Sequence, residues 1–185
     1  MKKIVFILGG ARSGKSSYAV ELAKKLNKRT VFIATCTSFD DEMKERIKMH
    51  KAQRPKEWKI IEEGKDINSV LTSFKNKYEI ILIDCLGMWI SNLLSDGLKD
   101  KQIEKEVFRL IKSISKLKGV TILVSNEVGM GIVPDNPLAR RFRDLLGRAN
   151  QITARIADEA IFMHSGIPVA IKERGKSAKT KGNNK

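Results

Sequence analysis

The sequence Gly9-Gly10-Ala11-Arg12-Ser13-Gly14-Lys15-Ser16 follows the pattern G-x-x-x-x-G-K-S, which is typical of a phosphate-binding loop. Its glycines allow the backbone to curl tightly, so that successive N–H groups point at phosphate oxygens. Lys15 supplies a positive charge for the β- and γ-phosphates, and Ser16 offers a hydroxyl ligand to Mg²⁺. The motif therefore predicts that these eight residues bind a nucleotide.

The residues on both sides of this loop agree with that prediction. Residues 4–8 form an unbroken apolar run, as expected of a strand that is buried on both faces of a sheet. After the loop, apolar residues recur at the spacing of one helix face: Ala19, Leu22, Ala23 and Leu26. The positive end of such a helix would face the same phosphates as the loop.

Further apolar runs that alternate with helical patterns predict an α/β fold. The runs that indicate strands lie at 30–34, 58–63, 79–84, 119–124, 160–163 and 167–172. The patterns that indicate helices lie at 41–51, 67–74, 86–94, 101–117 and 138–156. The pattern at 138–156 starts with the apolar Leu138, and the pattern at 101–117 places five residues inward: Ile103, Val107, Leu110, Ile111 and Ile114. We expect a three-layer fold of the P-loop NTPase type with a mainly parallel sheet. The short turn Ser165-Gly166 predicts a hairpin, and hence one antiparallel strand at the sheet edge.

The composition is that of a globular protein with an excess of positive charge. The chain has 185 residues, 42% hydrophobic and 31% charged, and we expect one domain over residues 1–172. Its formal net charge of +15 favours an anionic partner such as a nucleotide or a phosphorylated substrate. Residues 173–185 carry five Lys or Arg and one acid, with few apolar side chains. We expect this basic tail to be disordered.

Several classes of protein are disfavoured by the same sequence. No apolar run approaches the roughly 18 residues that cross a bilayer, and residues 4–8 are too few for a signal-peptide core. We therefore expect a cytoplasmic protein. Cys36 and Cys85 lie far apart and lack the spacing of paired ligands, which argues against a zinc site or a disulfide framework.

Acidic residues lie at or just beyond the carboxyl ends of two predicted strands. Ligands of an open α/β sheet bind at these carboxyl ends. Asp84 ends an apolar run, and in an enzyme with a phosphate loop this position favours a Mg²⁺ ligand over a solvated acid. Glu127 follows the run at 119–124. It suits a base for a substrate hydroxyl as well as an acid that caps a helix, and the sequence favours neither.

His50 allows two interpretations. It shares a predicted helix face with Met43 and Ile47, which by itself favours a partly buried structural histidine. Cations nearby would lower the pKa of this histidine and keep its imidazole neutral and nucleophilic. These cations are Arg46, Lys48, Lys51 and Arg54. Such clusters are also common on exposed helices without any function, so both interpretations stay open on spacing alone.

Two specific runs accompany the generic phosphate loop. They are N-E-V-G-M-G-I-V-P at 126–134 and F-R-D-x-x-G-R-x-N-Q at 142–151. Shorter matches are Asp41-Glu42-Met43, Arg46-Ile47 with His50, Asp84-Cys85, Asn92-Leu93-Leu94, Ala139-Arg140, Ala157-Asp158-Glu159 and Gly166-Ile167. In this order they resemble the bifunctional adenosylcobinamide kinase / adenosylcobinamide-phosphate guanylyltransferase family of cobalamin biosynthesis. The resemblance spans residues 3–172 and leaves the tail unmatched.

The resemblance implies two reactions at one nucleotide site. ATP or GTP first phosphorylates the aminopropanol hydroxyl of adenosylcobinamide. A histidine then attacks the α-phosphate of GTP, expels pyrophosphate and carries GMP to the cobinamide phosphate. The implied catalytic residues are His50, Lys15 and Asp84. Beyond Gly9, Gly10, Ala11, Arg12, Ser13, Gly14, Lys15 and Ser16, the implied nucleotide contacts are Ile33, Ala34, Thr35, Lys51, Ala52, Gln53, Arg54, Glu62 and Asp84.

The resemblance also implies Mg²⁺ on Ser16 and Asp84, a guanosine site lined by Glu62 and Asp84, and a homotrimer. Met49 departs from those relatives that carry a second histidine beside the first. One alternative is another P-loop kinase of small molecules without guanylyltransferase activity, which would leave His50 without a task. A nucleic-acid-dependent ATPase fits the charge, but only 6% of the residues are aromatic. A switch GTPase is disfavoured, because residues 76–79 read N-K-Y-E instead of N-K-x-D and precede a strand.

Overall fold

The computed structural model describes residues 2–36, 54–74 and 77–173. The strands are β1 (Lys3–Gly9), β2 (Thr30–Ala34), β3 (Lys59–Glu62), β4 (Ile80–Asp84), β5 (Val120–Asn126), β6 (Glu159–His164) and β7 (Ile167–Lys172). The helices are α1 (Lys15–Leu26), α3 (Ile67–Ser73), α4 (Leu86–Ser95), α5 (Asp100–Lys116) and α6 (Pro137–Ile156). The predicted helix at 41–51 and all but the first residue of the predicted tail lie outside the described residues.

In the described part of the chain, seven strands form one sheet in the order β3-β2-β4-β5-β1-β6-β7. All neighbours from β3 to β6 pair in parallel, and β6 pairs with β7 in the antiparallel sense. The predicted α/β fold, with its hairpin through Ser165-Gly166 and its antiparallel edge strand, is therefore confirmed. Since β1 lies between β5 and β6, the phosphate loop follows an interior strand.

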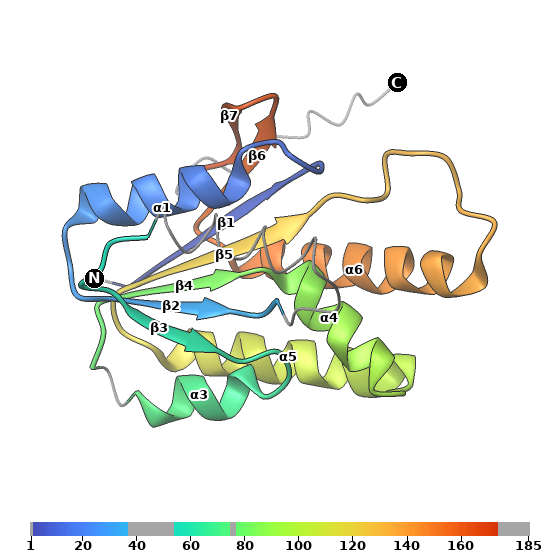
Figure 1. Cartoon of the computed structure of the whole chain (residues 1–185), viewed down its shortest axis with the longest axis horizontal. Helices are drawn as coiled ribbons and strands as arrows, with labels where there is room; N and C mark the ends of the chain where they lie inside the picture. The colour runs from blue at the N-terminus through green and yellow to red at the C-terminus, as the bar shows by residue number, and fades with distance from the viewer. Residues whose placement is uncertain (1, 37–53, 75–76, 174–185) are drawn as a thin grey trace, which may run out of the picture.

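Helices cover both faces of the sheet and complete the three layers (Figure 1). Among the helices that the structure describes, α1 lies on one face, and α3, α4, α5 and α6 lie on the other. Ala19, Val20 and Ala23 of α1 are buried against residues of the sheet such as Phe32 and Val124. These small side chains bring α1 close to the strands, and so hold the phosphate loop at the sheet edge.

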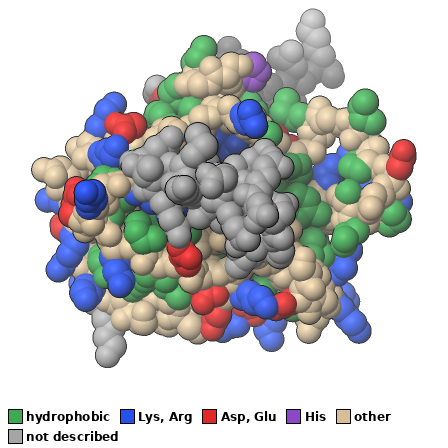
Figure 2. Space-filling model, viewed as in Figure 1, with side chains coloured by type: hydrophobic (Ala, Val, Ile, Leu, Met, Phe, Trp, Pro, Cys, Tyr) green, Lys and Arg blue, Asp and Glu red, His purple; other side chains and the backbone are tan. Residues whose placement is uncertain are grey.

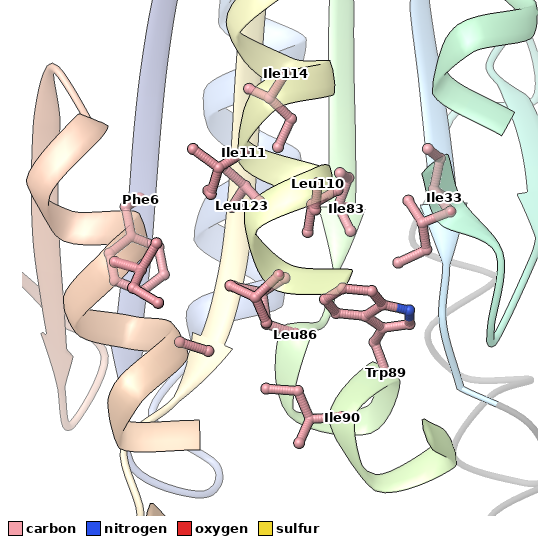
Figure 3. Packing of buried hydrophobic residues seen from close by; sticks show 14 of the residues in the cluster. Phe6, Ile33, Ile83, Leu86, Trp89, Ile90, Leu110, Ile111, Ile114 and Leu123 are labelled. Carbon is pink, nitrogen blue, oxygen red and sulfur yellow. The ribbon is translucent and has the colours of Figure 1, made fainter. Parts of the chain in front are cut away.

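The larger core lies on the opposite face and is built by α4 and α5. Figure 3 shows Leu86, Trp89 and Ile90 of α4 below residues of α5 and the strands. Trp89 is fully buried, and its Nε1 donates a hydrogen bond to the Lys65 carbonyl oxygen at 2.8 Å. All five residues predicted to face inward on α5 are buried: Ile103, Val107, Leu110, Ile111 and Ile114. The helical spacing therefore identified this contact correctly.

Two residues expected on buried helix faces are exposed. Leu26, the last residue of α1, is 38% exposed, and Leu138, in the first turn of α6, is 58% exposed. The end of α6 that carries Leu138 extends beyond the sheet in Figure 1, so no strand lies beneath it. A helical period gives the direction of a side chain but not the length of helix that the sheet covers.

The described residues contain no helix that is both long enough and apolar enough to cross a membrane. Cys36 and Cys85 are not joined by a disulfide bond. Within the same ranges, no three His, Cys, Asp or Glu side chains gather in a way that could hold a metal ion.

Gly119 and Gly147 should respond to alanine with opposite signs. Gly119 has φ +87°, and a Cβ there would lie 2.2 Å from the Glu79 carbonyl oxygen. Gly147 is inside α6 and has open space around its Cα. Gly119→Ala should lower the free energy of unfolding by about 2 kcal/mol or more, and Gly147→Ala should raise it by about 1 kcal/mol. Urea denaturation of both variants measures the free energy of unfolding. Equal changes in the two variants would contradict the view that Gly119 is held in a conformation and a space that only glycine fits.

Candidate nucleotide site at the carboxyl ends of the strands

The phosphate loop is held between β1, α1 and the β6–β7 hairpin. Gly9 approaches β6 so closely that a Cβ would lie 2.3 Å from the Met163 carbonyl oxygen. At the other side of the loop, Gly166 N–H donates to the Ser13 carbonyl oxygen at 3.1 Å. α1 begins at Lys15 with no acidic residue in its first turn, so its positive end is left for an anion.

Lys15 is a buried cation at this loop. Its side chain donates to the Gly10 carbonyl oxygen at 2.6 Å and reaches Ser13 Oγ at 3.5 Å. Only 7% of the residue is exposed. Burial lowers the pKa of Lys15, and the nearby Asp84 carboxylate opposes that shift. The ammonium group is therefore desolvated before any phosphate arrives, which makes a phosphate a favourable partner.

Three of the implied nucleotide contacts lie in one row across the sheet. Ala34 of β2 pairs with Glu62 of β3 on one side and with Asp84 of β4 on the other. The next residue, Thr35, joins the same strands: its Oγ1 accepts from Cys85 N–H and donates to the Cys85 carbonyl oxygen, both at 2.7 Å. Parallel pairing therefore brings two acids from distant parts of the sequence to the same edge.

Arg54 lies among these acids. Its guanidinium is 3.8 Å from the centre of the Phe32 ring. Burial lowers the pKa of Arg54, and Asp84 and Glu62 oppose this shift. Arg54 Nη1 is buried and has no hydrogen-bond partner among the residues that the structure describes. Because unsatisfied buried donors are rare, this nitrogen marks a place for an oxygen of a ligand.

The two thiols near the site are poor nucleophiles. Burial, and then the charge of Asp84, raises the pKa of Cys85 to about 12. The same two causes, in the same order, raise the pKa of Cys36. A thiolate is the reactive form of cysteine, so neither thiol is activated at neutral pH.

Glu127 lies at the carboxyl end of β5, beside the phosphate loop. Its N–H donates to the Gly9 carbonyl oxygen at 2.9 Å, and its Oε1 accepts from Gly129 N–H at 2.5 Å. The helix that follows, α6, is capped by Asn136, which accepts from the N–H groups of Leu138 and Ala139. Glu127 thus stabilises its own turn without capping α6.

The structure brings together most of the residues implied to bind nucleotide. The phosphate loop, Ala34, Thr35, Glu62 and Asp84 lie at the carboxyl-end edge of the sheet, and the Arg54 guanidinium interacts electrostatically with Glu62 and Asp84. The remaining positions on the chain between β2 and β3 lie outside the described residues: His50, Lys51, Ala52 and Gln53. Ile33 is fully buried, and Figure 3 shows its side chain in the core near Trp89. Its contact with a nucleotide would have to come from the backbone.

The sequence analysis missed a set of buried amides and hydroxyls beneath this edge. Asn92 donates from Nδ2 to the Thr35 carbonyl oxygen at 2.8 Å and to the Gly64 carbonyl oxygen at 2.9 Å. Asn150 donates to the Asn126 carbonyl oxygen at 3.0 Å and accepts from Ser125 Oγ at 2.6 Å. The one signal in the sequence was an asparagine within an otherwise apolar helix face, because a buried amide has to find partners.

Comparison with known proteins gives a consistent result. Residues 5–171 match the family described as cobinamide kinase / cobinamide phosphate guanyltransferase. The bifunctional adenosylcobalamin biosynthesis protein CobU of Escherichia coli (strain K12) is 38% identical over 181 residues, which cover 91% of this chain and 99% of that protein. The CobU protein of Salmonella typhimurium has the same identity and coverage. CobP of Pseudomonas aeruginosa is 39% identical over 166 residues, 90% of this chain and 95% of that protein.

Replacing Arg54 should weaken GTP binding without lowering the stability of the fold. Arg54→Met keeps the apolar contact with Phe32 and removes a buried donor that lacks a partner. We expect the free energy of unfolding to stay within about 0.5 kcal/mol or to rise, and the affinity for GTP to fall by about tenfold or more. Urea denaturation and titration calorimetry measure the two quantities. Arg109→Met, which removes an exposed arginine paired with Glu106, is the control and should leave GTP binding unchanged.

Cys85 should resist alkylation in the folded protein. With its pKa raised to about 12, almost none of this thiol is ionised at pH 8. In a Cys36→Ser variant, we expect iodoacetamide to modify native Cys85 at least about 100-fold more slowly than the urea-unfolded chain. The rate should rise as the pH increases toward that pKa. Equal rates for the native and unfolded chains at pH 8 would show that Cys85 is neither buried nor shifted.

Proposed function

Because this chain belongs to the cobinamide kinase / cobinamide phosphate guanyltransferase family, we propose that it carries out both reactions of that name. It phosphorylates the aminopropanol hydroxyl of adenosylcobinamide and then transfers GMP from GTP to the product, which gives adenosylcobinamide-GDP. The observation that carries the proposal is that the Arg54 guanidinium, whose buried Nη1 has no hydrogen-bond partner among the described residues, lies near Glu62 and Asp84, two acids on the sheet edge that carries the phosphate loop.

In the kinase reaction the phosphate loop holds the triphosphate of ATP or GTP. The ammonium of Lys15 exchanges its bond with the Gly10 carbonyl oxygen for phosphate oxygens, and α1 directs its positive end at the same charges. The aminopropanol oxygen forms a bond to the γ-phosphorus while the bond from that phosphorus to the β,γ-bridging oxygen breaks, so ADP or GDP leaves and the hydroxyl proton passes to a base or water. Catalysis here consists of positioning and of neutralising charge.

Mg²⁺ is part of this proposal. Ser16 stands at the start of α1 and Asp84 at the end of β4, and both are only partly buried. A hydroxyl and a carboxylate are the oxygen ligands that Mg²⁺ prefers beside phosphates, so these two residues fit the ion. When bound, Mg²⁺ would neutralise charge on the phosphates of the nucleotide.

In the guanylyltransferase reaction His50 is the proposed nucleophile. Its imidazole nitrogen forms a bond to the α-phosphorus of GTP while the bond to pyrophosphate breaks, which leaves GMP on the histidine as a phosphoramidate. A phosphate oxygen of adenosylcobinamide phosphate then attacks the same phosphorus and releases the histidine. Arg54 and Lys51 supply positive charge to the phosphate. Glu62 accepts hydrogen bonds from the guanine edge or from the ribose hydroxyls.

A second candidate is a P-loop kinase of small molecules without guanylyltransferase activity. It would use the phosphate loop and Asp84 in the same manner. It would leave His50 without a task, and it does not account for a buried arginine near Glu62. We therefore prefer the bifunctional enzyme, and formation of a covalent GMP adduct distinguishes the two.

We also propose a homo-oligomer, a trimer by family resemblance. Exposed apolar residues gather on the β5–α6 loop and on β7, and Figure 2 shows hydrophobic side chains around the end of the molecule where that loop lies. On the loop, Met130 is 81% exposed and Ile132 is 96% exposed. Exposed apolar groups of this kind support burial against another subunit.

Labelled GTP tests the proposed nucleophile. After incubation with Mg²⁺ and denaturation, wild-type protein should retain label from the α-phosphate and none from the γ-phosphate, and acid should release it. His50→Ala should retain none. The matched control is His164→Ala, because the chain has two histidines and His164 is exposed at the end of β6. No adduct in wild-type protein that binds GTP would reject His50 as nucleophile and leave the plain kinase.

A further inference from the structure

Asn92 connects two segments that end at the candidate site. It lies on α4, and only 3% of the residue is exposed. The two hydrogen bonds from its Nδ2 reach the carbonyl oxygens of Thr35, directly after β2, and of Gly64, two residues after β3. One amide group therefore ties the ends of two neighbouring strands to a helix on the face of the sheet.

The second of these strands needs such support. β3 is the edge strand of the sheet, has four residues, and pairs only with β2 among the described strands. Trp89, one helical turn before Asn92, donates from Nε1 to the carbonyl oxygen of Lys65, the residue after Gly64. Residues three apart lie on the same helix face, so α4 holds the turn after β3 with two side chains. An edge strand without such bonds would be free to shift along its neighbour.

The same Asn92 amide also supports Asp84, the second of the two acids at this edge of the sheet. Thr35, whose carbonyl oxygen accepts from Asn92, makes both bonds to the Cys85 peptide with its hydroxyl. That peptide directly follows Asp84. Asn92 is thus connected to Glu62 through Gly64 and to Asp84 through Thr35. Asn92 and Thr35 are buried, so the loss of their hydrogen bonds is costly, whereas Glu62 at the end of this chain of contacts is exposed.

We propose that Asn92 is a positioning residue for the guanosine part of the nucleotide: it fixes the distance between Glu62 and Asp84 across β3, β2 and β4. This inference rests on the proposed function, in which Glu62 contacts the guanosine, and on the family resemblance, which implies that Asp84 lines the guanosine site as well as holding Mg²⁺. The phosphate loop depends on other contacts, namely β1, α1 and the bond from Gly166 to Ser13. Asn92 therefore affects nucleoside binding and leaves phosphate binding by the loop in place.

Asn92→Asp tests this positioning role. The substitution keeps the shape of the side chain and replaces Nδ2, the donor of both hydrogen bonds, by a carboxylate oxygen that cannot donate. The probes are GMP, which reports on the nucleoside position, and inorganic triphosphate, which reports on the loop. By titration calorimetry we expect the affinity of Asn92→Asp for GMP to fall by about tenfold or more, and its affinity for triphosphate to change by less than about twofold.

The matched control is Asn68→Asp. Asn68 is 4% exposed, donates from Nδ2 to Glu106 and accepts from Ser113 Oγ, which links α3 to α5. This variant should lose stability and keep both affinities. Asn92→Leu provides a second test if Asn92→Asp does not fold. Both Asn92 variants are measured well below their melting temperatures.

Equal losses for both probes, or no loss for GMP, would overturn the role of Asn92. The adduct assay with labelled GTP reports separately on the proposed function. A wild-type protein that forms the adduct while Asn92→Asp binds GMP normally would refute only the positioning role. A wild-type protein that forms no adduct, combined with a selective GMP loss in Asn92→Asp, would refute the transferase and leave the positioning role intact.

Discussion

Two cations withdrawn from water, Lys15 and the partly buried Arg54, are the constraint on which the site depends. Burial lowers the pKa of both, and in both cases Asp84 opposes the shift. Moving such groups away from water costs free energy, and the buried Arg54 Nη1 has no hydrogen-bond partner among the described residues to offset that cost. Phosphate oxygens would satisfy both, so the cost of folding becomes part of the affinity for nucleotide. The large apolar cores on both faces of the sheet stabilise the fold and offset the cost of withdrawing these cations from water.

Topology places the phosphate loop and the two acids near Arg54 at one edge of the sheet. The phosphate loop follows β1, Glu62 ends β3 and Asp84 ends β4, whereas Arg54 comes before β3 and interacts with these acids through its guanidinium. Parallel strands end at the same side, so side chains from distant parts of the chain gather there. A site of this width suits a ligand with phosphates at one end and a base at the other. In the proposed function, one set of phosphate-binding groups serves two transfers, to a hydroxyl and to a histidine.

The sequence predicted the elements well and their mutual contacts less well. The phosphate loop, the strand runs and the inward face of α5 depend on local spacing, which a sequence displays directly. Leu26 and Leu138 were placed wrongly, because their burial depends on where the sheet ends. The bonds from Asn92 join residues 57 and 28 positions apart, and no local pattern encodes them. Arg54 and Glu62 were indicated by family resemblance, since their own neighbours carry no distinctive spacing.

The strand order also determines where a label or a surface linker can be attached without disturbing the candidate site. β7 runs back from the hairpin beside the phosphate loop, and its last residue, Lys172, pairs with Ala160 near the start of β6. Lys172 therefore lies toward the amino ends of the parallel strands, at the opposite end of the sheet from β3 in strand order. A fluorophore or a surface linker joined after this point would begin at a distance from the Glu62–Asp84 row. The end of β7 is thus a suitable anchoring point for immobilised or single-molecule work on the enzyme.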